Sequence, residues 1–138
     1  MGVNRFRVVR GSYSKSETPP MPYVLVRVYT PTKSRSIEVE AKIDTGFSGT
    51  LLLSIEDYLR LGLQLYERLE KALGVIAGGY HIELRVSRGI VELNGVLIPC
   101  NIYTTLFAKK SLLGRGILNR FRAHLDGLSK SVVLEIPP

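Results

Sequence analysis

The chain has 138 residues, of which 45% are hydrophobic and 22% charged, and its formal net charge is +7. This length and composition predict one globular domain and exclude a disordered chain, and no apolar run approaches the ~18 residues of a membrane span. One cysteine and two histidines exclude an internal disulfide and argue against a metal site, so we expect no cofactor. Because no apolar signal segment is visible near Met1, we expect a cytoplasmic protein without a membrane partner.

The beginning of the chain differs in composition from the rest. A polar, Pro-rich loop over 11–22 follows a short predicted strand at 3–10. We therefore divide the chain into an N-terminal strand with a Pro/Ser-rich arm, 1–21, and a main domain, 22–138. No internal repeat or linker indicates a further domain.

Two strands are predicted at the start of the main domain. Residues 23–30 are rich in β-branched and aromatic side chains, which favour a strand. Residues 36–43 alternate apolar with charged side chains, which is typical of a half-buried strand. We expect these strands to form a hairpin, and the second strand to end at Asp44.

A short helix is expected next. Ser54 is a suitable N-cap with an acidic residue, Asp57, three positions later, and Gly62 is a suitable C-terminal stop. These residues predict a helix over 55–61. The following segment, 64–73, is compatible with either a helical or an extended conformation.

The second half of the chain predicts hairpins around a helical segment. A Gly-rich tip at 74–79 leads into an alternating strand, and Asn94-Gly95 is the preferred two-residue turn of a hairpin. Apolar residues within 111–121 recur at helical spacing, and two short strands are expected around Asp126-Gly127. The whole pattern indicates an all-β fold with one or two short helices.

The sequence IDTGFSGTLLL contains the first candidate for chemistry. Asp44 follows an apolar strand, and Gly46 can turn the backbone sharply enough for its N–H to approach the carboxylate. Thr45 supplies a short hydroxyl between them. An Asp-x-Gly sequence after a strand is most often a plain turn, so the interpretation depends on what else the chain contains.

Two further segments follow this motif in a fixed order. The Gly-rich GVIAGGYHI begins about 30 residues later, and LLGRGILNRFRAHLDG places Gly114 70 residues after Asp44 (114 − 44). In this order and spacing the chain resembles a retropepsin-like aspartic protease of the retroviral and Ddi1-like group, over roughly residues 22–136. The resemblance implies a single-lobed acid protease barrel.

The resemblance also implies a role for each matching residue of the active-site loop. Asp44 matches the catalytic aspartate, and Thr45 matches the hydroxyl residue that bonds across a dimer. Gly46 matches the glycine that lets the loop pass under the carboxylate. The matching flap, which folds over substrate, consists of Val75, Ile76, Ala77, Gly78, Gly79 and Tyr80.

A second matching element is expected to pack beside the active-site loop. Gly114 matches its glycine, and Leu112 and Leu113 match the apolar residues that precede it. Arg115 matches the arginine that opens the following helix. The sequence departs from the family pattern at Gly116, where relatives often have Asp or Asn.

The chemistry of aspartic proteases requires two carboxylates that share one proton. The chain contains three aspartates, and only Asp44 lies in a suitable motif, since Asp57 falls in the predicted helix and Asp126 in a hairpin turn. The second carboxylate must therefore come from another copy of the chain. We expect an endopeptidase whose site forms across a homodimer interface and whose substrate is a peptide or an unfolded protein.

Two other functions are consistent with the same sequence. A catalytically weak or inactive member of the fold would bind peptides or dimerise without cleaving them. A basic β-barrel could bind nucleic acid, because the net charge is strongly positive. Nucleic acid is the less favoured partner, since the 19 Lys and Arg residues are scattered and accompany no nucleic-acid-binding motif.

Overall fold

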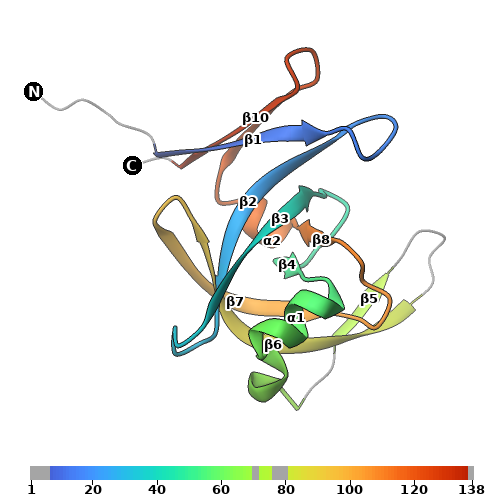
Figure 1. Cartoon of the computed structure of the whole chain (residues 1–138), viewed down its shortest axis with the longest axis vertical. Coiled ribbons are helices and arrows are strands. Elements are labelled where there is room, and N and C mark those ends of the chain that lie inside the picture. The colour runs from blue at the N-terminus through green and yellow to red at the C-terminus, as the bar shows by residue number, and fades with distance from the viewer. Residues whose placement is uncertain (1–6, 70–71, 76–80, 137–138) are drawn as a thin grey trace, which may run out of the picture.

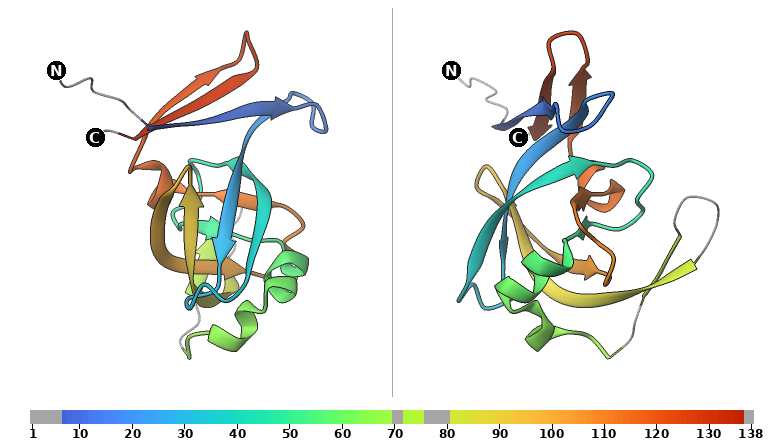
Figure 2. Two further views of the ribbon diagram at one scale, coloured as in Figure 1. Left: turned by 60° about the vertical axis from the view of Figure 1, so that its left-hand side comes forward. Right: turned by 45° about the vertical axis from the view of Figure 1, so that its right-hand side comes forward.

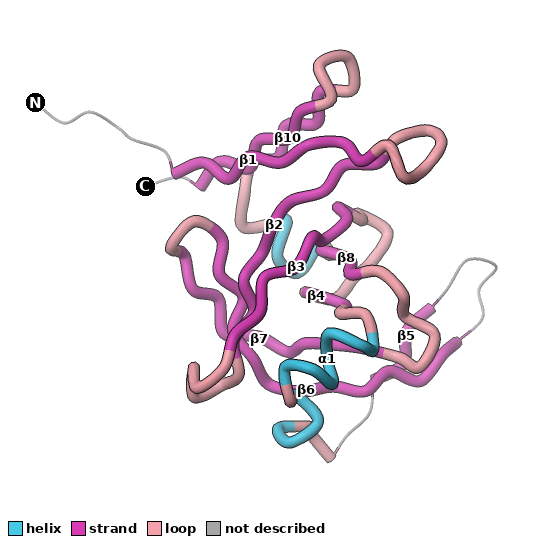
Figure 3. The backbone as a smooth tube through the Cα atoms, in the orientation of Figure 1, coloured by secondary structure: helices cyan, strands magenta, loops and turns pink. Residues whose placement is uncertain are grey.

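The structure is a computed structural model that describes residues 7–69, 72–75 and 81–136. Within these residues ten strands form one sheet, and three short helical segments connect them (Figures 1 and 3). The strands are β1 (Arg7–Ser14), β2 (Met21–Tyr29), β3 (Ser36–Ile43), β4 (Leu51–Leu52), β5 (Ala72–Val75), β6 (His81–Leu93), β7 (Val96–Thr104), β8 (Ser111–Leu113), β9 (Arg122–Asp126) and β10 (Ser131–Ile136). The helices are α1 (Ile55–Leu61), the 3₁₀ helix η1 (Leu63–Tyr66) and α2 (Arg115–Leu118).

Six of the strands close into a barrel. Their order is β6-β7-β4-β8-β3-β2, and β2 pairs in turn with β6, where Arg27 lies opposite Glu92. The remaining strands extend from this barrel: β5 pairs with the first part of β6, while β1, β10 and β9 continue the sheet beyond β2. Figure 2 shows β1, β9 and β10 as a separate layer above the barrel. The all-β barrel expected from the sequence is confirmed.

The barrel interior is filled by aliphatic side chains from alternate strand positions. On β2, Val24, Val26 and Val28 are each at most 1% exposed, while the intervening Leu25 is 52% exposed. This alternation is the period-two pattern of a strand with one buried face. α1 covers one side of the barrel core and contributes Tyr58, which is completely buried.

Several local predictions are confirmed in detail. β3 has the predicted bounds, pairs with β2 as an antiparallel hairpin and leads directly to Asp44. α1 also has the predicted bounds, with the Ser54 hydroxyl accepting a hydrogen bond from the Asp57 N–H and with Gly62 in the left-handed conformation. The turn between β6 and β7 has positive φ at Asn94 and Gly95, as a type I′ turn requires.

Two other predictions differ from the structure. β1 runs from Arg7 to Ser14, beyond the strand predicted at 3–10, because Gly11 and Ser12 pair with β10; positions 3–6 of that prediction lie outside the described residues. The helical pattern across 111–121 is the second difference, because its first residues form β8 and its helix contains only Arg115–Leu118. The segment 64–73, for which the sequence left both conformations open, includes the end of η1 and the start of β5, and its positions 70–71 lie outside the described residues.

The last two strands and the helices complete the description. β9 and β10 form the expected hairpin around Asp126-Gly127, and all five residues of β9 are exposed. None of the helices in the described part of the chain is long and apolar enough to cross a membrane.

Candidate active site

The site is defined by strands that end at the same edge of the barrel. β3 and β8 pair in parallel, with Ile43 opposite Leu113. Parallel strands point in one direction, so the loops that follow them leave the sheet together. Asp44 and Gly114, which are 70 residues apart in sequence, therefore become neighbours, and the Asp44 N–H donates to the Leu113 carbonyl at 3.0 Å.

The Asp44 carboxylate is held by its own loop. The Gly46 N–H donates to Asp44 Oδ1 at 2.9 Å, and the Phe47 N–H donates to the Asp44 carbonyl at 3.2 Å. The Asp44 side chain is half-buried, while Thr45 and Gly46 are exposed. The other carboxylate oxygen accepts no hydrogen bond from the described residues, so at the rim of the barrel it can take part in chemistry.

Backbone hydrogen bonds join this loop to the start of α2. The Gly114 N–H donates to the Thr50 carbonyl at 2.8 Å, and the Arg115 N–H donates to the Phe47 carbonyl at 2.9 Å. A third bond, from the Gly116 N–H to the Gly49 carbonyl, measures 3.0 Å. The two loops are thus held together by main-chain groups, whose positions do not depend on side-chain rotamers.

Close packing explains why glycine is needed at the contact. A Cβ on Gly114 would lie 2.2 Å from the Gly49 carbonyl oxygen and 2.6 Å from Cδ2 of Phe47. The Phe47 ring also lies over Gly49 and meets Tyr103 edge-on, with ring centroids 6.0 Å apart. Only a residue without a side chain permits this approach.

The residues predicted to pack beside the loop occupy the expected positions. Leu113 is completely buried and Leu112 is half-buried, both in β8, and Gly114 follows them in an extended conformation. Arg115 is the first residue of α2, and its side chain is exposed.

The flap prediction can be followed only in part. Val75 ends β5 and pairs with His81 at the start of β6, so these strands form an antiparallel hairpin. The other predicted flap residues, Ile76, Ala77, Gly78, Gly79 and Tyr80, lie outside the described residues. Figure 1 shows the hairpin extending from one side of the barrel.

Sequence reasoning did not assign a packing role to Thr50, Gly49 or Gly116, which shape the loop contact. Thr50 accepts from the Gly114 N–H through its carbonyl, and its hydroxyl donates to the Asn101 carbonyl on β7. Gly49 and Gly116 meet at the contact between the loops, where a Cβ on Gly116 would lie 3.0 Å from the Gly49 oxygen. The glycines in FSGT and GRG were the available signal, since both follow the matched motifs at short spacing.

Other reactive groups lie apart from this loop contact. Asp126 Oδ1 accepts from the N–H groups of Leu128 and Ser129, which identifies a turn carboxylate, and these bonds lower its pKa. Burial raises the pKa of the Cys100 thiol to about 11, as expected for a structural cysteine. No group of three His, Cys, Asp or Glu side chains able to hold a metal ion exists within the described ranges.

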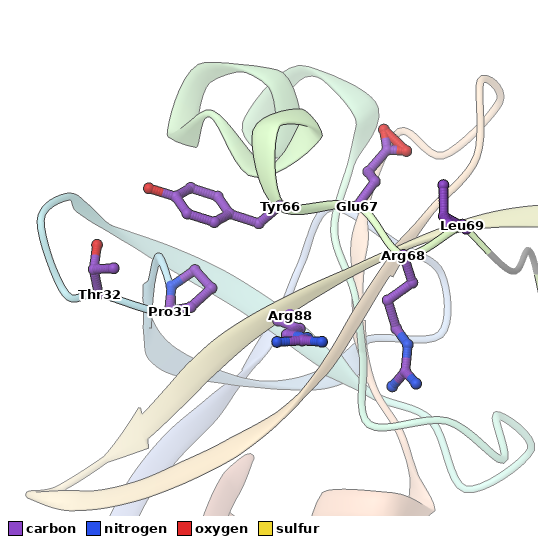
Figure 4. A pocket seen from close by; sticks show the side chains of 7 residues that line it. All are labelled: Pro31, Thr32, Tyr66, Glu67, Arg68, Leu69 and Arg88. Atoms are coloured by element: carbon purple, nitrogen blue, oxygen red, sulfur yellow. The ribbon is translucent and has the colours of Figure 1, made fainter.

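A surface hollow of about 460 Å³ lies elsewhere on the barrel (Figure 4). Seven residues line this hollow: Pro31 and Thr32 in the β2–β3 turn, Tyr66 at the end of η1, Glu67, Arg68 and Leu69 after η1, and Arg88 on β6. Glu67 forms an ion pair with Arg85, whose Nε lies 2.9 and 3.2 Å from the two carboxylate oxygens of Glu67. None of these residues belongs to the loops around Asp44, so the hollow is separate from the candidate active site.

The fold of the chain is similar to those of several solved structures, and three of them are described here. The crystal structure of a retropepsin-like aspartic protease from Rickettsia conorii aligns with a TM-score of 0.67 and 18% identity, covering 99% of this chain and 97% of that one. The EIAV protease complexed with the inhibitor HBY-793 aligns with a TM-score of 0.52 and 22% identity, covering 78% and 91%. The retroviral protease-like domain of Ddi1 from Leishmania major gives a TM-score of 0.49 and 20% identity, covering 85% and 92%.

Comparison of the sequence alone does not identify a family. No protein-family model matches it, and no curated protein matches it at a significant level. At identities of 18% and 22%, the structural likeness establishes the fold. The chain therefore has the retropepsin-like fold, as its resemblance to that family predicted, and its activity has to be argued from the site.

Proposed function

We propose that the chain is one subunit of an aspartic endopeptidase whose active site forms between two identical copies. The observation that carries the proposal is the position of Asp44, whose carboxylate is held by the Gly46 N–H at the barrel rim, beside a loop contact built from main-chain bonds. The retropepsin-like fold supports the same assignment.

The proposed reaction uses the two Asp44 carboxyl groups of a dimer as a pair. Like charges at close range cannot both ionise, so the pair holds one proton and titrates as a unit. The ionised carboxylate takes a proton from a water molecule, which attacks the peptide carbonyl. The protonated carboxyl donates to the carbonyl oxygen, which gives a tetrahedral intermediate with two hydroxyl groups. The carboxyl that took the water proton then passes it to the peptide nitrogen, the other carboxylate takes a proton from one hydroxyl, and the C–N bond breaks to release the amine.

Dimerisation follows from the number of suitable acids. Asp44 is the single aspartate of the chain in an Asp-Thr-Gly motif. A twofold axis beside the motif would bring each residue against its symmetry mate. Thr45 is exposed, and its hydroxyl makes no hydrogen bond within the part of the chain that the structure describes, which supports a role for this hydroxyl at such an interface.

The substrate we propose is an extended peptide segment. The β5–β6 hairpin beside the barrel offers strand edges to which a peptide can add by main-chain hydrogen bonds. Extended segments are accessible in unfolded proteins and in flexible loops. The hairpin would act as the flap that covers the bound segment.

The test compares cleavage of an unstructured protein by the wild type, Asp44→Asn and Asp126→Asn between pH ~3 and ~7. Loss of one member of an acid–base pair should lower the rate by about 10²–10⁴-fold, so Asp44→Asn should be nearly inactive. Asp126→Asn is the matched control, since Asp126 also precedes a glycine but serves a turn. Undiminished cleavage by Asp44→Asn would contradict the proposal.

The same assay is repeated at several enzyme concentrations. A site shared between two copies loses specific activity on dilution below the dimer dissociation constant. Binding of peptide without cleavage at any concentration would favour an inactive binding module. Steeply salt-dependent nucleic-acid binding that Asp44→Asn leaves unchanged would favour the basic barrel.

A further inference from the structure

The loop between β1 and β2 contains a carboxylate with an unusual number of partners. Glu17 accepts from Lys42 Nζ at 3.0 Å through each of its oxygens. Its Oε1 also accepts from Lys110 Nζ at 2.7 Å and from the Tyr23 hydroxyl at 3.0 Å. The side chains of Glu17 and Lys42 are only 23% and 22% exposed, so the cluster is partly shielded from solvent.

Two partners of Glu17 lie on or next to the two strands that carry the candidate active site. Lys42 is on β3, two residues before Asp44, and Lys110 immediately precedes β8, four residues before Gly114 (114 − 110). The fourth residue, Tyr23, lies opposite Lys42 on β2. One carboxylate therefore joins the β1–β2 loop to both strands whose ends form the loop contact.

We propose that Glu17 is a positioning residue for the active-site loop, and that it acts by holding the ends of β3 and β8 in their parallel register. Its contacts come from segments 25 and 93 residues away. Such links restrain the relative movement of two strands more than a local ion pair can. The catalytic consequence rests on the proposed peptidase function, while the structural consequence can be measured without it.

The cluster keeps its charge in acid. Lys110 and then Lys42 lower the pKa of Glu17 to about 2 from its usual 4.5. Other charged groups lie close by, since a second surface hollow, lined in part by Tyr23 and Lys110 of the cluster, is also lined by Glu40, Asp57 and Lys109. A carboxylate whose pKa is lowered by folding stabilises the native state above its unfolded pKa, and this contribution is lost as the pH falls through the folded value. The restraint is therefore retained at pH 3 to 5, where ordinary surface carboxylates become protonated.

The experiment uses Glu17→Gln, which removes the charge and keeps the side-chain shape. Its matched control is Glu40→Gln, which removes an exposed acid on β3 that has no ion pair in the described structure. Hydrogen exchange should show faster exchange, by about threefold to tenfold, at the amides of Asp44, Gly114 and Arg115 in Glu17→Gln alone. The β6–β7 amides in the same samples report any global loss of stability.

The two possible outcomes of the exchange measurement are distinct. Faster exchange at the loop amides than in the β6–β7 ladder supports a positioning role. Unchanged exchange, or an equal increase in both regions, overturns it. The same comparison at pH ~4 should still separate Glu17→Gln from the wild type, because Glu17 remains ionised there.

Coupling and catalysis provide independent checks. In a variant with both Lys42→Gln and Lys110→Gln, adding Glu17→Gln should change loop exchange by less than about twofold, because the shared interaction is already absent. With an active enzyme, Glu17→Gln should lower kcat by about threefold to tenfold and change KM less. If the wild type cleaves nothing, the peptidase proposal fails, and hydrogen exchange still decides the role of Glu17.

Discussion

Replacing Gly114 with alanine would place a methyl group in the contact between the two active-site loops. The added Cβ would lie 2.2 Å from the Gly49 carbonyl oxygen and 2.8 Å from the Phe47 carbonyl oxygen. Both distances are shorter than any van der Waals contact, and both atoms belong to the main chain. At φ −96° and ψ 179° the backbone of Gly114 is acceptable for alanine, so the expected effect is purely steric.

The expected loss of stability in Gly114→Ala depends on the groups that the new methyl displaces. Insertion of a methyl group into a packed region typically costs about 1–3 kcal/mol. The displaced carbonyls also accept the hydrogen bonds from Arg115 and Gly116, and each such bond contributes about 1 kcal/mol net. We therefore expect Gly114→Ala to lower the free energy of unfolding by about 2–4 kcal/mol and to abolish peptidase activity in the remaining folded protein.

Urea unfolding at one fixed protein concentration measures this difference, since dimerisation would otherwise alter the midpoint. Gly127→Ala is the control, because a Cβ there meets nothing within 4 Å and should change stability by less than about 0.5 kcal/mol. The loss of stability in Gly116→Ala should fall between these two, because a Cβ there would lie 3.0 Å from the Gly49 carbonyl oxygen. Equal stabilities for Gly114→Ala and Gly127→Ala would refute the packing argument.

Two further measurements test other parts of the structure. Ser54→Ala removes the cap whose hydroxyl accepts from the Asp57 N–H, and should cost about 1 kcal/mol in urea unfolding; an unchanged midpoint would contradict the assigned cap. Cys100, whose thiol pKa is raised to about 11 by burial, should react slowly with a disulfide reagent at pH ~8 and rapidly in urea. Fast reaction of the native protein would contradict its burial.

Elements with strong local determinants could be predicted from the sequence. α1 has a capping serine, a stop glycine and an internal apolar face, so its bounds follow from residues within one short segment. β3 alternates apolar and charged residues along its whole length. The Asn94-Gly95 turn is equally local, since both residues adopt the positive φ that defines it.

Elements that depend on distant partners were predicted less well. Ser111–Leu113 continues an apolar spacing that suits a helix, yet it forms β8 because β3 and β4 pair with it on either side. Gly11 and Ser12 read as loop residues, but pairing with β10 extends β1 through them. In both cases tertiary hydrogen bonds outweigh local preference.

The residues of the candidate site also fall into those that local sequence predicts and those that depend on distant partners. Asp44 and Gly46 were identified because short spacing defines their motif, and the resemblance to a known family implied their roles. The cluster around Glu17 carries no local pattern, since its partners Lys42 and Lys110 are 25 and 93 residues away. Side-chain ion pairs of this kind become visible only when the fold has brought the segments together.

These observations indicate how the barrel fixes a carboxylate without relying on neighbouring side chains. The bonds that hold the Asp44 loop come from main-chain N–H groups of Gly46, Gly114 and Arg115. Substitutions that alter only the polarity of side chains outside the Glu17 cluster should therefore leave the geometry of the loop intact. Substitutions that add a Cβ at the contact, or that release the ends of β3 and β8, should alter the geometry of the loop. They separate the backbone segments that fix the position of the carboxylate.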